Sequence, residues 1–151
     1  MVHAPAPGVL IARGVSRLLA EHGFACLTEV PTAEGGRMDV LALGPQGALW
    51  CVEVKSSRED FTSDAKWQRY LPYCDAFFFA VPNDFPTDLL PAEHGLIVAD
   101  AWGGEIFRDP PQNPVAAARR KAITLRFARL AADRLTRAEG NASRLSAADQ
   151  G

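Results

Sequence analysis

The chain contains few of the residues that build zinc sites or disulfide frameworks. Its 151 residues include three cysteines and three histidines. Cys26, Cys51 and Cys74 are widely spaced, form no CxxC pair and have no cluster of histidines beside them. We therefore expect buried free thiols in a reducing compartment, which favours a cytoplasmic protein.

Long apolar runs and a basic leader are also missing. Arg13 and Arg17 interrupt the first apolar stretch, so we expect neither a signal peptide nor a membrane span, and no membrane partner. The length suits one domain with a sizeable core.

The net charge of −2 hides a strong asymmetry along the chain. Residues 112–139 contain seven bases and two acids, which gives +5 and leaves −7 for the rest. The densest bases are Arg119, Arg120 and Lys121. Such a segment indicates either a polyanionic partner, here DNA, or a solvated helix whose bases offset an acidic patch in the same fold.

Hydrophobic periodicity and turn residues predict the order αβββαββα. The strands are expected at 24–30, 38–43, 49–55, 75–81 and 95–99, and 105–107 is a candidate short edge strand. Helices are expected at 8–22, from the capping box at Ser57 to about Tyr73, and from about Val115 to Arg137. The predicted organisation is a loose lead-in (1–7), a single mixed α/β domain (8–139) and a flexible tail (140–151).

The short turn between the second and third strands allows their register to be predicted. If the turn centres on Gln46, facing positions sum to 92, which pairs 42 with 50, 40 with 52 and 39 with 53. One face then carries the core, and the other places Asp39 opposite Glu53 with Lys55 two residues further on. Facing Cβ atoms lie about 4.5–5.5 Å apart, so the two carboxylates can share a cation.

The first hairpin extends this row if its loop centres on Glu34, because Glu29 then faces Asp39. Adjacent carboxylates repel one another unless a cation or a raised pKa relieves the repulsion. Oxygen ligands favour Mg²⁺ or Mn²⁺. The alternative reading is a solvated polar face without a metal. In this register Arg37 faces Lys55, where it either holds a phosphate or only balances the acids.

The motif formed by Asp39, thirteen residues and Glu53-Val54-Lys55 is similar to the core motif of the PD-(D/E)XK nuclease superfamily. The strings GGRMDVLALGPQGALWCVEVKSSREDF, DAKWQRYLPYCDAFFFAVP, GLIVADAWG and ARRKAITLRFARLAADRL resemble the MmcB-like family, bacterial proteins associated with DNA repair. The resemblance covers most of the chain. It implies a restriction-endonuclease-like mixed sheet with an αβββαβ core, helices on both sides and a long C-terminal helix.

The resemblance also implies roles for single residues. Asp39 and Glu53 would ligate the metal, together with the Val54 carbonyl. Lys55 would orient or help deprotonate the attacking water, or stabilise charge on the phosphate. The superfamily often adds an acid from the first helix, which would be Glu21 here, but we favour Glu29 because it fits the row. Where related nucleases carry Gln-x-x-x-Tyr, this chain has Lys66 and Tyr70.

These residues predict a metal-dependent DNA nuclease acting in bacterial DNA repair, with Mg²⁺ or Mn²⁺ as cofactor. The alternative is a nuclease-fold module that binds DNA or a repair partner without cutting. The small size also suggests dependence on a repair protein or a homodimer. The candidate DNA contacts, each weighed against a solvated helix charge or a packed side chain, are Arg37, Arg58, Lys66, Tyr70, Arg119, Arg120 and Lys121.

Overall fold

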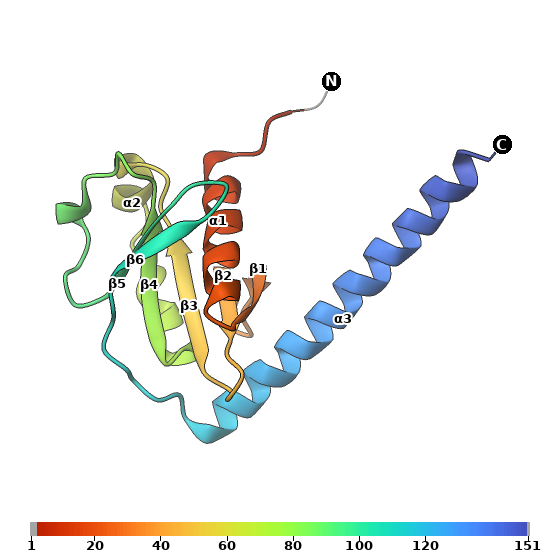
Figure 1. Cartoon of the computed structure of the whole chain (residues 1–151). Helices are drawn as coiled ribbons and strands as arrows, with labels where there is room; N and C mark the ends of the chain where they lie inside the picture. The colour runs from red at the N-terminus through yellow and green to blue at the C-terminus, as the bar shows by residue number, and fades with distance from the viewer. Residues whose placement is uncertain (1–2, 151) are drawn as a thin grey trace. The chain divides into compact units, whose positions relative to one another are not determined.

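The computed structural model describes residues 3–150, which divide into two compact units at Ala116 and Ala117. The first unit is built on a six-stranded sheet in the order β1-β2-β3-β4-β5-β6 (Figure 1). Its strands are β1 (Ala25–Pro31), β2 (Arg37–Leu43), β3 (Leu49–Val54), β4 (Ala76–Val81), β5 (Gly95–Ala99) and β6 (Gly104–Arg108).

The direction of the strands changes across the sheet. The first three strands form an antiparallel meander, β3, β4 and β5 run parallel, and β6 returns antiparallel to β5. The short 3₁₀ helix η2 (Thr87–Leu89) lies on the connection from β4 to β5. The expected mixed sheet is therefore confirmed, and each predicted strand agrees with the observed one to within about one residue at each end.

One face of the sheet is covered by helix α1 (Pro7–Glu21) (Figure 1). Its apolar side (Ile11, Val15, Leu18 and Leu19) packs with strand residues that include Val52 and Phe78 in one buried cluster. The strict alternation of side chains along a strand puts Val40, Ala42, Val52 and Val54 on this face, as the register had predicted.

The opposite face is covered by α2 (Arg58–Ser63) and the 3₁₀ helix η1 (Trp67–Tyr73). Trp67 packs against Phe77 and Phe79 of β4 at ring-centroid distances of 5.5 and 5.0 Å. Helices thus lie on both sides of the sheet. However, the expected continuous helix from Ser57 to about Tyr73 is wrong, because the helix breaks at Asp64 and Pro72 lies inside the 3₁₀ segment. The predicted N-cap at its start is confirmed, since Ser57 Oγ accepts the Asp60 N–H, while the Asp60 carboxylate accepts the N–H of Ser56.

The second unit is the long helix α3 (Ala117–Ala148). Its predicted end near Arg137 is wrong, and residues 140–148, expected as a flexible tail, are helical. Alanine, arginine and leucine in this stretch favour helix, and a single Gly140 costs only about 1 kcal/mol.

No helix within residues 3–150 is long and apolar enough to cross a membrane. The three cysteines are free, with Cys51 and Cys74 buried and Cys26 half-buried.

Candidate functional site

The turn between β2 and β3 sets the geometry of the site. Gly44 and Gly47 close it, and Gly47 has a φ of 90° that favours glycine. The observed pairs are 40 with 52 and 42 with 50, so the predicted register is confirmed. The backbone pairing ends at Val40 and Val52, one position short of Asp39. There the Asp39 carboxylate accepts the Val54 N–H at 2.8 Å, so the carboxylate is held beside the end of β3.

Lys55 follows β3 directly and is held on both sides. Its N–H donates to the Ala80 carbonyl at 2.9 Å, which continues the parallel pairing with β4. Its side chain is 3% exposed, with Nζ 2.6 Å from Asp64 Oδ2 and 3.6 Å from Glu53 Oε1. Burial opposes the charge on this amine, but the hydrogen bond to Asp64 and the charge of Glu53 outweigh burial and raise the pKa of Lys55. Lys55 is therefore a fixed ammonium group at neutral pH.

Glu53 is buried, and its two carboxylate oxygens differ in their contacts, because only Oε1 lies near Lys55 Nζ. Its Oε2 atom has no hydrogen-bond partner among the described residues. Burial, followed by the charge of Asp39, raises the pKa of Glu53 from 4.5 to about 8, although Lys55 acts in the opposite direction. Burial also raises the pKa of Asp39, against the Val54 N–H and the charge of Lys55, which lower it. Two carboxyl groups thus share a site that disfavours their ionised forms.

These groups line a cavity of about 570 Å³, which we call the acidic cavity. One wall comes from α1, and the remaining walls come from β1, β2, the end of β3 and α2. Five carboxylates line it against two bases. The lining residues are Gly8, Val9, Ala12, Arg13, Thr28, Glu29, Asp39, Glu53, Val54, Lys55, Asp60 and Asp64.

Glu29 occupies its predicted register and lines the acidic cavity together with Asp39 and Glu53. The β1–β2 pairs 28 with 40 and 30 with 38 place it opposite Asp39. Its φ of 53° is left-handed, which interrupts the ladder, and its exposed carboxylate lies 3.9 Å from Arg37 Nη2. Within residues 3–150 no three His, Cys, Asp or Glu side chains are grouped closely enough to hold a metal. Glu21, the other candidate, is exposed at the end of α1 and is absent from the cavity lining.

The remaining candidates on the first unit lie in different environments. Arg37, Arg58 and Lys66 are exposed. Tyr70 is buried, and its hydroxyl accepts the Arg37 N–H at 3.0 Å. It therefore anchors the start of β2 and presents no ring face for a base to stack on. Arg119, Arg120 and Lys121 all lie in the first turns of α3, on the second unit.

The sequence analysis did not predict three charged residues that line the acidic cavity. Asp60 had been assigned only to the capping box, yet it lines the cavity and accepts the Ser56 N–H. Asp64 ends α2 and holds Lys55. Arg13, named above only as an interruption of the first apolar stretch, also lines the cavity. Two acids four residues apart just after the Lys55 strand are the one signal that could have revealed the first two.

The donor set fits a hard divalent cation. Carboxylate oxygens are the ligands that Mg²⁺ and Mn²⁺ prefer. Glu53, whose Oε2 has no hydrogen-bond partner among the described residues, and Asp39 interact electrostatically in the same negative cavity. Thiolate and imidazole ligands, which zinc sites use, are absent from the residues that line the cavity.

Comparisons with known proteins agree with this architecture. The chain is similar to a solved structure, the SPO1766 protein of unknown function from Silicibacter pomeroyi, with 51% sequence identity and a TM-score of 0.86. The match covers 88% of this chain and 91% of that one. No curated protein matches the chain. Residues 3–142 match the family described as DNA repair protein MmcB-like. The chain therefore belongs to the MmcB-like family of DNA repair proteins.

Proposed function

We propose that this protein is a divalent-cation-dependent nuclease that hydrolyses DNA phosphodiester bonds during repair. The observation that carries the proposal is the unpartnered Oε2 of buried Glu53 beside Asp39. A buried carboxylate without a partner is costly. A fold that keeps one next to a second carboxyl group gains from a cation that binds both.

The charge of the acidic cavity also supports the binding of a divalent cation. Five carboxylates and two bases line it, so a DNA phosphate is repelled unless cations reduce the negative potential. Asp39 and Glu53 would hold such an ion, with the Val54 carbonyl as a further predicted ligand. When bound, a divalent cation neutralises charge on the phosphate and lowers the pKa of a coordinated water.

Lys55 supplies the second positive charge. Because its hydrogen bond to Asp64 keeps it protonated, it acts as a donor to a phosphate oxygen rather than as the base that accepts a proton from water. A lysine ammonium is a compact point charge suited to this role. Charge aimed at the position where negative charge develops stabilises the transition state without reorganisation.

Arg13 is the base best placed to contact DNA at the cavity, since it is exposed on α1 and lines the wall facing the carboxylates. Arg37, Arg58 and Lys66 remain predicted phosphate contacts on the first unit. The bases at the start of α3 remain predicted contacts on the second unit. Contacts of this kind bind the backbone and carry no sequence preference.

The test is a cleavage assay on duplex, nicked, branched and single-stranded DNA with Mg²⁺ or Mn²⁺. Asp39→Asn and Lys55→Ala are expected to lower the cleavage rate at least a hundredfold, roughly the effect of removing one transition-state donor. Glu59→Gln is the matched control, because Glu59 is an exposed acid on α2 outside the cavity.

Two results would contradict the proposal. If Asp39→Asn and Lys55→Ala cut as fast as the parent, the activity lies elsewhere. If the parent cuts no substrate but binds DNA with a steep salt dependence, the protein is a binding module that keeps the nuclease-like site without cleavage. Circular dichroism and thermal unfolding of each variant separate loss of activity from loss of fold.

A further inference from the structure

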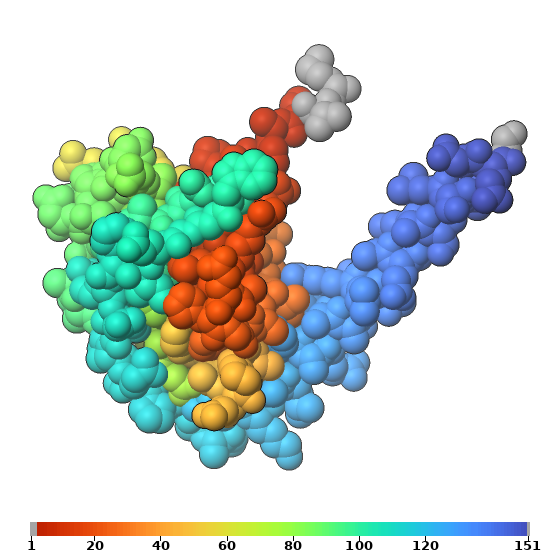
Figure 2. All heavy atoms as spheres, in the orientation of Figure 1, coloured from red at the N-terminus to blue at the C-terminus, as the bar shows by residue number. Residues whose placement is uncertain are grey.

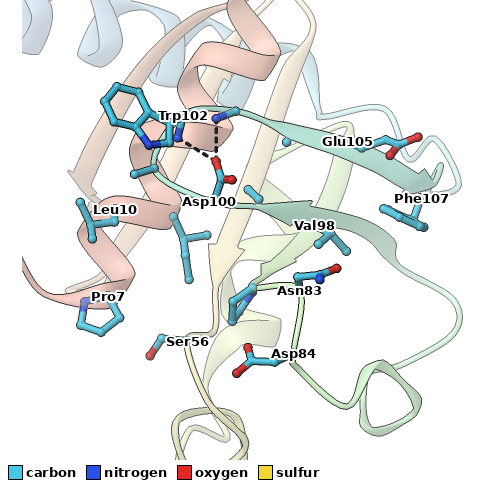
Figure 3. A pocket seen from close by; sticks show the side chains of 16 residues that line it. Pro7, Leu10, Ser56, Asn83, Asp84, Val98, Asp100, Trp102, Glu105 and Phe107 are labelled. Carbon is cyan, nitrogen blue, oxygen red and sulfur yellow. Dashed lines mark hydrogen bonds between the residues drawn. The ribbon is translucent and has the colours of Figure 1, made fainter.

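A second hollow lies on the first unit, between the start of α1 and the β5–β6 hairpin (Figure 3). It encloses about 930 Å³, and we call it the hairpin groove. Its residues come from α1, the segment after β3, the segment after β4, and the hairpin. They are Pro7, Leu10, Ile11, Ser56, Pro82, Asn83, Asp84 and residues 98–105 and 107.

The groove carries large apolar side chains that remain exposed to solvent. Trp102 is 76% exposed and Phe107 is 62% exposed. Exposed tryptophans are uncommon on monomer surfaces, and those that bind partners contribute disproportionately to affinity. An apolar floor with aromatic anchors is typical of a site that another molecule covers.

The groove is also held in a fixed shape. Asp100 Oδ1 accepts the N–H groups of Trp102 and Gly103 at 2.8 and 3.1 Å, which defines the turn between the two strands (Figure 3). The Arg17 guanidinium lies 5.4 Å from the centre of the Trp102 ring. The hairpin rests directly on α1 (Figure 2). At this contact Gly14 faces the Asp100 carbonyl without room for a side chain. A preorganised surface binds with less loss of entropy.

The charge of the groove selects the chemistry of its occupant. Asp84, Asp100 and Glu105 are exposed carboxylates on its lining, and no lysine or arginine is among the described lining residues. Arg17 is the neighbouring base, and it already lies over Trp102. A nucleic-acid backbone is repelled by such a surface, whereas a segment that combines apolar and basic side chains is complementary to it.

We propose that the hairpin groove binds a segment of a partner protein in which a large apolar side chain is flanked by lysine or arginine. The apolar side chain packs on Trp102, and the basic groups pair with Asp84 and Glu105. The groove adjoins the acidic cavity at the start of α1, where Pro7 lines the groove and Gly8 lines the cavity. A partner bound here is therefore next to the site, although this inference does not depend on nuclease activity.

The test is selection from a random peptide library displayed on phage, with the full-length chain immobilised. The enriched peptides are expected to combine Trp, Phe or Leu with Lys or Arg. The dissociation constant of a representative synthetic peptide should rise at least about tenfold in Trp102→Ala, as for a binding hot spot. Leu145→Ala is the matched control, because Leu145 is 72% exposed and lies on α3 outside the groove.

A charge reversal tests whether basic groups of the peptide pair with Glu105. Glu105→Arg should weaken binding of the basic peptide about tenfold, while Glu59→Arg on α2 should leave it unchanged. Far-ultraviolet circular dichroism confirms that each variant folds.

The contrary outcomes are distinct. The proposal is overturned if no peptide is enriched, if the enriched peptides are acidic or uncharged, or if their binding is insensitive to Trp102→Ala. It is also overturned if single-stranded DNA, rather than peptide, loses affinity in Trp102→Ala. Concentration-dependent self-association that Trp102→Ala abolishes would identify a second copy of this chain as the occupant instead.

Discussion

Glu53 is the residue at which burial and function conflict most directly. With a pKa raised from 4.5 to about 8, the folded protein binds a proton between these pH values that the unfolded chain has released. The free energy of unfolding therefore falls as pH rises through this window. The native carboxyl is neutral at pH 5 and becomes an unfavourable buried charge near pH 8.

We predict that the chelator-treated protein loses on the order of 2 kcal/mol of stability between pH 5 and pH 8.5 from this group. Urea unfolding at several pH values measures it. Glu53→Gln should flatten the profile, whereas Glu59→Gln should leave it as in the parent. Because cations bind the ionised form, stabilisation by Mn²⁺ should increase with pH and disappear in Glu53→Gln. An equal pH slope in the parent and Glu53→Gln would show that Glu53 titrates normally.

Asp64 acts through Lys55, so it is a positioning residue. Its Oδ2 atom lies 2.6 Å from Lys55 Nζ, and without it the ammonium retains only the contact with Glu53 at 3.6 Å. If the protein cleaves DNA, Asp64→Asn should lower kcat about ten- to hundredfold, the effect of a small misplacement, with little change in KM. Asp64→Glu should recover part of the rate.

The exposed Asp88→Asn serves as the control for this series, since Asp88 lies in η2 and outside both cavities. A loss in Asp64→Asn that appears as raised KM, or that Asp64→Glu fails to recover, would mean that the aspartate binds substrate or only supports the fold.

Among the elements, α1 and the β5–β6 hairpin are the pair most sensitive to a single methyl group. A Cβ at Gly14 would overlap the Asp100 carbonyl and crowd the Gly103 carbonyl, and both are backbone atoms that cannot rotate away. Gly14→Ala should therefore lower the free energy of unfolding by about 1–3 kcal/mol, as for overpacking. Thermal and urea unfolding measure the change.

Gly103→Ala is the control at the same contact, because a Cβ there meets open space and the backbone is not left-handed. Its effect should stay within about 0.5 kcal/mol. Equal stability of Gly14→Ala and the parent would show that the helix and hairpin can separate without cost.

Elements governed by local rules were predictable from the sequence. Alternation located the strands, and the four-residue turn from Gly44 to Gly47 determined the register that brings Asp39 to Glu53. The helix break at Asp64 was missed because the capping box at Ser57 marks where a helix starts but not where it stops. Asp64 was missed for the same reason, since its contact with Lys55 arises only when α2 ends at Ser63. The left-handed φ of Glu29 has no local signal, as glycine is the usual residue there.

At the scale of the whole molecule, Asp75 connects segments far apart in the chain. Its Oδ2 atom accepts the Leu49 N–H at 2.8 Å and its Oδ1 atom accepts the Val115 N–H at 2.9 Å. Its own backbone pairs with Leu49 and Asn113. One buried carboxylate thus joins the start of β3, the start of β4 and the segment that precedes α3.

Asp75→Ala should lower the free energy of unfolding by about 2–5 kcal/mol, because two buried N–H groups lose their acceptor. Urea unfolding followed by tryptophan fluorescence measures it, with the exposed Asp88→Ala as control. A change below about 0.5 kcal/mol would show that water replaces the carboxylate at both amides.

The hydrogen bonds of residues 113 and 115 also determine where a shortened chain can end. They complete the hydrogen bonding of Asp75 one residue before the first unit ends at Ala116. A chain truncated before residue 113 would lose both of these bonds to Asp75. The shortest chain that keeps them therefore includes Val115.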